Sequence, residues 1–255
     1  MVIYAGLDIG SLTVEAVLLD ASEEVVATGF GYSGARPSKA AERVLNEALA
    51  KAGVGLDDIF LVATGYGRIS VPFAEATVTE ITCHAKGAHK VLAGVRTVID
   101  IGGQDSKAIA LDGHGRVIDF AMNDKCAAGT GRFLEVMAKA LEVPLEEMAA
   151  LAMNHKKEIK VSSTCTVFAE SEVISLLAEG HDTGDILWGV IRSIASRIAA
   201  LAQRVGLREP VMLSGGVAKN EAVKLALEDI FGVGIFVPPD PQIIGALGAA
   251  LIAKE

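Results

Sequence analysis

The chain reads Asp8-Ile9-Gly10-Ser11 near its start and, 92 residues further on, Asp100-Ile101-Gly102-Gly103. When the sequence is slid on itself by this interval, further identical residues coincide downstream of the two turns: Ala16, Leu19, Asp20 and Val25 fall on Ala108, Leu111, Asp112 and Val117. Self-similarity at a fixed period is the mark of an internal repeat. The sequence therefore predicts a duplicated fold in which each half carries one of these turns.

Both copies show the same local pattern, in which an apolar strand, a tight glycine turn, a second strand, a polar turn and a third strand follow one another. We predict strands at 3–8, 13–20, 25–32, 59–64, 97–101, 107–111, 116–122, 211–213 and 235–237. Helices are predicted at 38–52, with Ser38 as its N-cap, and at 131–140, 167–178, 183–205, 220–229 and 242–253. This alternation is typical of an α/β protein. We expect an N-terminal lobe at 1–95, a C-terminal lobe at 96–241, and a final segment, 242–255, that packs on the first lobe.

The composition fits a protein with a substantial buried core, because 51% of its 255 residues are hydrophobic. The formal net charge of -9 disfavours nucleic acid as a partner, since duplex binding requires a basic face. No apolar run reaches the roughly 20 residues that span a bilayer, and the N-terminus shows no leader-like segment. We therefore expect no membrane contact and a cytoplasmic location. Three cysteines, Cys83, Cys126 and Cys165, cannot all pair within one chain, and cytoplasmic thiols stay reduced.

The two glycine turns are candidate phosphate-binding sites, because a turn between two strands brings backbone N–H groups close to an anion. Ser11 and Thr13 add hydroxyl donors to the first turn. Either turn taken singly is equally well explained as an ordinary β-hairpin. Two copies favour a nucleotide site, in which Asp8 and Asp100 face one cleft and hold waters of a Mg²⁺ ion that bridges the phosphates. Gln104 then orients the attacking water, although it is also explained as a surface turn residue.

A third glycine segment follows the predicted strand at 211–213, where Ser214-Gly215-Gly216 leads towards a helix. Two adjacent glycines let the backbone lie flat against a purine or ribose, although a plain strand-to-helix turn explains the same residues. Its position after two phosphate turns favours adenosine. The full set of predicted nucleotide contacts is Gly10, Ser11, Leu12, Thr13, Gly102, Gly103, Gln104, Ser106, Gly215, Gly216 and Lys219.

Three residues near these motifs are left open or given no functional role. Lys107 either contacts phosphate or points to solvent from an edge strand, and the sequence does not decide between the two. His84 lies in a predicted helical stretch and is assigned no function. Its neighbour Cys83 is interpreted as structural.

Cys126 and Cys165 both precede predicted helices, which makes them candidate metal or cluster ligands. A helix N-terminus favours thiolate over thiol and offers backbone N–H donors to sulfur. The alternative is a pair of buried structural cysteines in apolar α/β packing. A cubane iron–sulfur cluster takes four cysteine ligands, and a two-fold dimer that contributes both cysteines from each subunit supplies that number.

Taken together, the two phosphate turns, the glycine segment at 214–216 and the small-residue run at 244–249 resemble the superfamily of acetate and sugar kinases, heat-shock proteins and actin. The resemblance covers essentially the whole chain. It implies an α/β, duplicated actin-like (ribonuclease H-like) ATPase fold with two lobes around a nucleotide cleft. The superfamily includes kinases, motors and chaperones, so the fold alone does not give the function.

Four motifs resemble the activator components of 2-hydroxyacyl-CoA dehydratases: KCAAGTGRFLE at 125–135, SSTCTVFAESE at 162–172, TGYGR at 64–68 and EITCHA at 80–85. That family is similar to the ATPase subunits of benzoyl-CoA reductase and to the reductases of double-cubane cluster proteins. The resemblance implies a homodimer with one bridging four-iron, four-sulfur cluster on Cys126 and Cys165. Such a dimer binds ATP, ADP and Mg²⁺, accepts an electron from ferredoxin or flavodoxin, and passes it to a partner enzyme as ATP is hydrolysed.

Other functions compete with this ATP-dependent electron donor. A small-molecule kinase of the same fold needs a carboxylate base beside a substrate pocket and has no use for metal-ligating cysteines. A reductase of a double-cubane cluster protein differs only in its acceptor. A non-enzymatic module is also considered, either an actin-like assembly protein or a dimer held by zinc through the same thiolates. The redox ATPase ranks above these because of the paired cysteine motifs.

Overall fold

The computed structural model of the protein describes residues 2–161 and 165–255. It divides into two compact units. Unit 1 comprises Met1–Val98, Leu111–Asp119 and Pro238–Glu255, and unit 2 comprises Ile99–Ala110 and Phe120–Val237. Each unit has its own hydrophobic core. Among the described residues, no helix is both long and apolar enough to cross a membrane.

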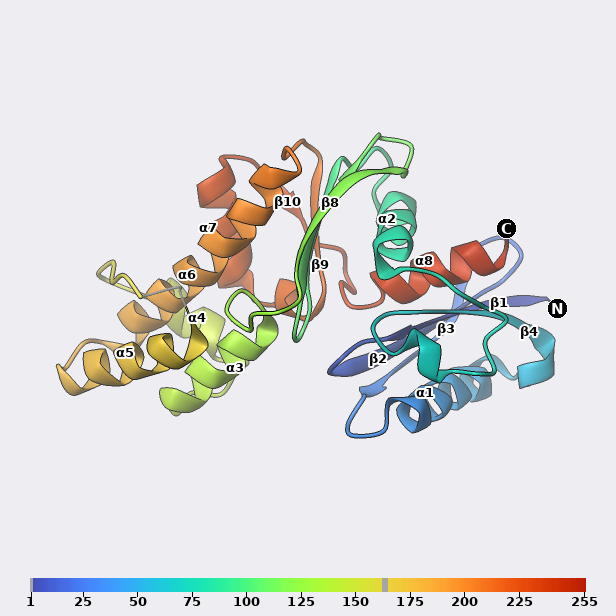
Figure 1. Ribbon diagram of the computed structural model, residues 1–255, viewed down its shortest axis with the longest axis horizontal. Coiled ribbons are helices and arrows are strands. Elements are labelled where there is room, and N and C mark those ends of the chain that lie inside the picture. Colours follow the sequence, from blue (N-terminus) through green and yellow to red (C-terminus); the bar gives the residue numbers. More distant parts are fainter. Residues whose placement is uncertain (1, 162–164) are drawn as a thin grey trace. The chain divides into compact units, whose positions relative to one another are not determined.

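The sheet of unit 1 has the strand order β3-β2-β1-β4-β5, and β1 lies at its centre (Figure 1). β1 pairs antiparallel with β2 and parallel with β4, and β2 pairs antiparallel with β3. Alternate side chains of β1 and β2 face opposite ways, so one face packs on α1 and the other on α8. The elements of this unit are β1 Ile3–Ile9, β2 Thr13–Leu19, β3 Val25–Tyr32, α1 Pro37–Ala52, η1 Leu56–Asp58, β4 Ile59–Thr64, η2 Arg68–Ser70, β5 Ala76–Thr77, α2 Glu80–Val91 and α8 Ile244–Ala253.

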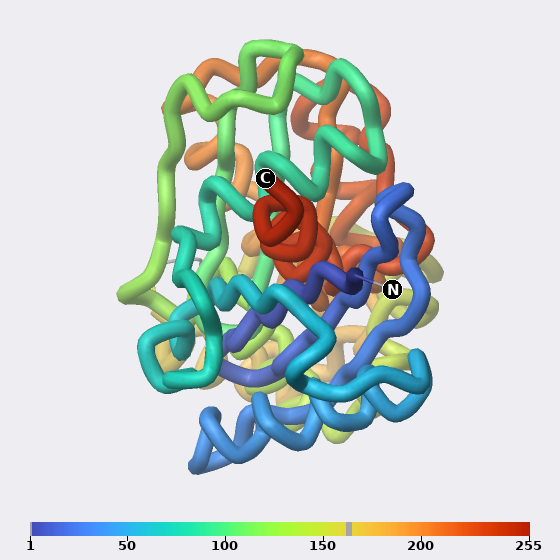
Figure 2. The backbone as a smooth tube through the Cα atoms, turned by 90° about the vertical axis from the view of Figure 1, so that its right-hand side faces the viewer, coloured from blue at the N-terminus to red at the C-terminus, as the bar shows by residue number. Residues whose placement is uncertain are grey.

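The C-terminal helix α8 packs closely on its neighbours because glycines leave room for its backbone. A Cβ atom on Gly6 of β1 would overlap the Ala246 carbonyl oxygen. A Cβ atom on Gly248 of α8 would overlap the carbonyl oxygen of Cys83 in α2. Figure 2 shows the red C-terminal helix lying beside the dark-blue strand β1. The small residues of the 244–249 run are therefore packing positions.

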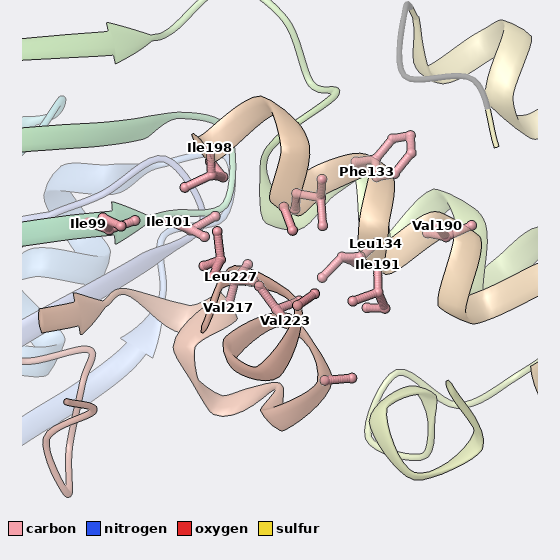
Figure 3. Close-up of a cluster of buried hydrophobic side chains, with 14 of the residues drawn as sticks. Ile99, Ile101, Phe133, Leu134, Val190, Ile191, Ile198, Val217, Val223 and Leu227 are labelled. Atoms are coloured by element: carbon pink, nitrogen blue, oxygen red, sulfur yellow. The ribbon is translucent and has the colours of Figure 1, made fainter. Parts of the chain in front are cut away.

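The second sheet, most of whose residues belong to unit 2, has the strand order β10-β9-β6-β7-β8. The strands of this sheet and the helices of unit 2 are β6 Thr97–Ile101, β7 Ser106–Leu111, β8 Val117–Asn123, α3 Gly131–Ala140, α4 Met148–Met153, α5 Thr166–Ala178, α6 Thr183–Arg204, β9 Val211–Ser214, η3 Gly216–Lys219, α7 Glu221–Phe231 and β10 Ile235–Phe236. The 22-residue helix α6 contacts α3, α4, α5 and α7. Figure 3 shows the core that this arrangement buries, with Ile99 and Ile101 of β6, Phe133 and Leu134 of α3, Val190, Ile191 and Ile198 of α6, Val217 of η3, and Val223 and Leu227 of α7.

The predicted strands and helices are confirmed with shifts of one or two residues at their ends, but the start of α1 is wrong in one respect. The helix begins at Pro37, and Arg36 rather than Ser38 occupies its N-cap. Proline suits the first turn of a helix because its missing N–H has no intrahelical partner there. The short elements β5, α4, η1, η2 and η3 were not predicted. Of the motif at 162–172, the first three residues lie outside the described part of the chain.

Candidate functional site

The first glycine turn joins β1 to β2, and its carbonyl groups are held from behind by other elements of unit 1. Gly67 N–H donates to the Ile9 carbonyl at 2.8 Å, and the Ser33 hydroxyl donates to the Gly10 carbonyl at 2.7 Å. In a trans peptide the C=O and N–H bonds point in opposite directions. The N–H of Gly10 is therefore opposite to the Ile9 carbonyl, and the N–H of Ser11 is opposite to the Gly10 carbonyl. The N–H groups of Gly10 and Ser11 are thus directed away from the supporting loops, as an anion-binding turn requires.

The Asp8 carboxylate lies in a confined space formed by unit 1 alone. Asp8 is 8% exposed and pairs in register with Glu15 on β2 and Thr64 on β4. His84 of α2 places its Nε2 atom 3.8 Å from Asp8 Oδ2. Cβ atoms on Gly65 and Gly245 would each overlap a carboxylate oxygen of Asp8. Backbone therefore encloses this side chain on two sides, and the position of its oxygens is fixed by glycine.

The second glycine turn joins β6 to β7 and is held by the start of α3. Gly131 N–H donates to the Gly102 carbonyl at 2.8 Å, and Arg132 N–H donates to the Gly103 carbonyl at 2.9 Å. The trans peptides then direct the N–H groups of Gly103 and Gln104 away from α3. The Gln104 side chain is exposed. These two N–H groups and the Gln104 amide form the part of the turn that can meet a phosphate.

Asp100 is held on both of its carboxylate oxygens within unit 2. The Ser214 hydroxyl donates to Asp100 Oδ1 at 3.0 Å, and Lys107 Nζ lies 3.2 Å from Asp100 Oδ2. Lys107 Nζ also lies 2.8 Å from Asp105 Oδ2. Of the two alternatives for Lys107, the one that points it to solvent from an edge strand is wrong, because β7 lies between β6 and β8 and Lys107 is 3% exposed. Ser106 is also fully buried.

The predicted adenosine segment lies directly against the second phosphate turn. Gly215 has a φ of 85°, and a Cβ atom there would overlap the Ile101 carbonyl oxygen and lie 2.9 Å from Asp100 Oδ1. A positive φ and a blocked Cβ position together require glycine. Gly216 and Lys219 are exposed on the short helix η3. The segment thus presents backbone beside the carboxylate of the second turn.

The two cysteine motifs differ in how they meet their helices. Cys165 is the N-cap residue of α5, as predicted. Cys126 lies in a loop, and Thr130 is the N-cap of α3. The expectation that α3 offers its N–H groups to the Cys126 sulfur is wrong, because its first N–H groups bind the carbonyls of the phosphate turn. Both thiols are free and half-buried.

The loop that carries Cys126 is instead fixed by side-chain hydrogen bonds. Asn123 Nδ2 donates to the carbonyls of Cys126 at 2.8 Å and Ala128 at 3.2 Å. The Thr130 hydroxyl donates to the Ala127 carbonyl at 2.7 Å, just before α3 begins. The first residues of α3 therefore support the phosphate turn, and the Cys126 loop leads directly into the same helix.

Cys83 is of a different kind from the other two cysteines. It is completely buried in α2, and burial raises the pKa of its thiol to about 12. A thiol that stays protonated is neither a nucleophile nor a good metal ligand. The structural interpretation of Cys83 fits this environment.

Comparison with known proteins finds relatives over nearly the whole chain. The model of the BadF/BadG/BcrA/BcrD ATPase family matches residues 5–253. This chain belongs to that family. The (R)-2-hydroxyglutaryl-CoA dehydratase activating ATPase of Acidaminococcus fermentans is 48% identical to it over 100% of this chain and 98% of the relative.

Two solved structures of activators resemble this family member closely. Component A of the A. fermentans (R)-2-hydroxyglutaryl-CoA dehydratase has a TM-score of 0.96 and 46% identity, covering 100% of this chain and 98% of the other. The activator of the 2-hydroxyisocaproyl-CoA dehydratase of Clostridium difficile, solved with bound ADPNP, has a TM-score of 0.94 and 45% identity, covering 99% and 94%. The predicted actin-like α/β fold is confirmed, and the protein is an ATP-binding ATP hydrolase.

Sequence reasoning about this BadF/BadG/BcrA/BcrD-type ATPase gave no definite role to four residues that the structure places beside the predicted ones, although it named Lys107 as a possible phosphate contact. They are His84 and Gly245 beside Asp8, Lys107 beside Asp100, and Asn123 beside Cys126. One signal pointed to Lys107, because it lies seven residues after the repeated aspartate and two residues after the acidic Asp105. No local pattern pointed to Gly245, because it is far from Asp8 in the sequence and the fold alone brings the two residues together.

Proposed function

We propose that this protein is a homodimeric iron–sulfur ATPase that couples ATP hydrolysis to the delivery of a low-potential electron into a 2-hydroxyacyl-CoA dehydratase or a related iron–sulfur enzyme. The observation that carries the proposal is the pair of free, half-buried thiols at Cys126 and Cys165. Both belong to unit 2, which also holds the second phosphate turn. Relatives named as dehydratase activators support the choice of acceptor.

The donor set of a single chain supports a cluster shared between two chains. Among residues 2–161 and 165–255, no group of three or more histidine, cysteine or acidic side chains is arranged to hold a metal ion. Two thiolates are half of the set that a cubane cluster requires. A two-fold dimer doubles every ligand, so Cys126 and Cys165 of both subunits complete it.

Helix α5 supports the same dimer with an apolar surface that begins at Cys165. Val167 and Phe168 are 64% and 66% exposed, and Ile174 and Leu177 are 51% and 42% exposed. Exposed apolar side chains gathered on one element mark an interaction surface. Because α5 starts at a proposed cluster ligand, a second subunit that shares the cluster lies close enough to cover this helix.

The nucleotide is held by the two phosphate turns and the glycine segment. In this proposal Asp8 and Asp100 hold waters of Mg²⁺, the N–H groups of Ser11 and Gly103 bind phosphate, and Gln104 orients the attacking water. The remaining predicted contacts are Gly10, Leu12, Thr13, Gly102, Ser106, Gly215, Gly216 and Lys219.

A four-iron, four-sulfur cluster, when bound, stores and passes on one electron, received here from ferredoxin or flavodoxin. The chain supplies the coupling. The N–H groups of Gly131 and Arg132 connect the phosphate turn to the helix that follows the Cys126 loop. A change in the turn on ATP hydrolysis therefore reaches a cluster ligand through one helix start. The positive end of α5 at Cys165 stabilises negative charge on the cluster by about 0.3–2 kcal/mol.

The alternative functions are less well supported. The activator names of the relatives do not favour a small-molecule kinase, and a kinase gives no purpose to two free thiols. A double-cubane reductase uses the same chemistry with another acceptor, so the choice between the two depends on the partner.

The deciding experiment measures iron and acid-labile sulfide on protein purified without oxygen. We expect about four of each per dimer, and loss of both in Cys126→Ala and Cys165→Ala. Cys83→Ala is the matched control, and we expect it to retain the cluster. The ATP-dependent activation of a 2-hydroxyacyl-CoA dehydratase by the reduced protein then tests the acceptor. Protein that binds one zinc and no iron, or ATP hydrolysis that depends on a small phosphate acceptor, would overturn the proposal.

A further inference from the structure

We propose that Lys107 is a positioning residue for ATP hydrolysis, which fixes the Asp100 carboxylate and closes the second phosphate turn through Asp105. The inference rests on the ATPase activity of the family and is independent of the iron–sulfur proposal. It gives a role to a lysine whose function the sequence left open.

The geometry is that of a single ammonium group shared by two carboxylates. Lys107 Nζ lies 3.2 Å from Asp100 Oδ2 and 2.8 Å from Asp105 Oδ2. The side chains of Lys107, Asp100 and Asp105 are 3%, 4% and 26% exposed. Charges as buried as those of Lys107 and Asp100 interact strongly, and they persist only when they are paired. The ammonium group therefore restrains the position of both carboxylates.

The contact with Asp105 also closes the turn that holds Gly103 and Gln104. The Asp105 carbonyl accepts a hydrogen bond from Gly102 N–H at 3.0 Å, so Asp105 closes the turn through its backbone while its side chain binds Lys107. Lys107 thus joins the residue at the entrance of the turn, Asp100, to the residue at its exit. Movement of Asp105 would rotate the peptide planes between them and misdirect the two N–H groups.

The internal repeat shows that the fold itself does not require a lysine at this position. The first copy builds the same strand–turn–strand unit with Glu15 where the second has Lys107, and with Thr13 where the second has Asp105. Glu15 pairs in register with Asp8 and is also buried. Because one architecture accommodates opposite charges at equivalent positions, the lysine serves a requirement of the second turn alone.

The test compares ATP hydrolysis in full-length variants purified without oxygen. Asp105→Ala removes one end of the link at a partly exposed position, and Asp105→Asn keeps an oxygen that accepts from Lys107. Lys107→Met removes the link altogether. Lys90→Met is the matched control, since Lys90 forms an ion pair with Glu23 at 2.8 Å on the surface of unit 1. For each variant, kcat, KM for MgATP and melting temperature are measured.

We expect kcat to fall about 10-fold in Asp105→Ala, to return to within about 3-fold of the parent in Asp105→Asn, and to fall about 100-fold in Lys107→Met, as for a misplacement of about 1 Å. KM changes less than kcat, because the other motifs still bind the nucleotide. Lys90→Met leaves both constants unchanged. Equal kcat in Asp105→Ala and Asp105→Asn would overturn the inference, as would a folded Lys107→Met protein with parental kcat. If Lys107→Met does not fold, the comparison of kcat between Asp105→Ala and Asp105→Asn tests the inference. Neither measurement depends on the iron content of the protein.

Discussion

Replacing Gly245 by alanine should abolish most ATP hydrolysis while leaving the protein folded. A Cβ atom at this position would overlap Asp8 Oδ2 and lie 3.0 Å from His84 Nε2. Gly245 does not have a positive φ, so alanine fits its backbone without strain. The methyl group therefore acts on the Asp8 carboxylate, which must move by at least about 1 Å to relieve the overlap.

The expected loss of activity and the expected change in stability are estimated separately. A displacement of about 1 Å at a catalytic group costs about 100-fold in rate, which corresponds to about 2.7 kcal/mol in the activation barrier. In the helix, alanine is preferred over glycine by up to about 1 kcal/mol, and the displaced carboxylate costs about 0.5–1.5 kcal/mol if it leaves its rotamer. These two stability terms nearly cancel. We expect kcat to fall about 100-fold while the melting temperature stays within a few degrees.

The assay is steady-state ATP hydrolysis together with thermal unfolding, and two glycine variants serve as controls. Gly234→Ala adds a Cβ atom with nothing within 4 Å, so activity and stability should both be unchanged. Gly248→Ala meets the Cys83 backbone and should lower the melting temperature instead. A Gly245→Ala protein with parental kcat would refute the reasoning, because Asp8 would then tolerate displacement. A large loss of stability in that variant would equally refute it.

Three further predictions concern charge and thiols. Two lysine hydrogen bonds lower the pKa of Glu23 to about 2, below its ordinary 4.5, so their stabilisation is present above about pH 4.5 and is lost as the pH falls towards 2. Glu23→Gln should cost about 1 kcal/mol or less at pH 7, because the site is partly exposed, and nothing near pH 2, as judged by urea unfolding. Cys83, with a pKa raised to about 12, should resist iodoacetamide at pH 8 until the protein is unfolded, and labelling of the native protein would contradict this. Asn123→Ala should raise the alkylation rate of Cys126 several-fold in cluster-free protein, and an unchanged rate would show that the loop is held by other bonds.

The sequence predicted the duplicated sheets well because the signal is local. Apolar alternation and glycine turns specify where a strand begins and ends, and the repeat confirmed each pattern with a second copy. The elements that were missed, β5, α4 and the short helices η1, η2 and η3, have only two to six residues and are too short to show a period. The wrong N-cap at Ser38 arose because two signals compete at the start of this helix. Serine favours the N-cap and proline favours the first turn, and here the helix begins at Pro37.

The candidate site was less predictable because its contacts cross between elements distant in sequence. Periodicity indicates which face of β7 carries Lys107, but it does not indicate that Asp100, which accepts from Ser214, pairs with this lysine. Likewise, a helix start after Cys126 was correctly predicted, yet the use of its N–H groups depends on the carbonyls of Gly102 and Gly103. Such partners are set by topology and cannot be read from a local pattern.

The placement of α8 has a consequence for the order in which the protein folds during synthesis. β1 is made first, but the backbone that packs against its Gly6 belongs to residues 244–253. A nascent chain that has emerged only as far as β10 can assemble the contiguous core of unit 2, whereas one face of the first sheet is still bare. Domains commonly fold in the order of their synthesis. Here the unit that starts first is completed last, and the nascent chain must keep that apolar face from aggregating until α8 arrives.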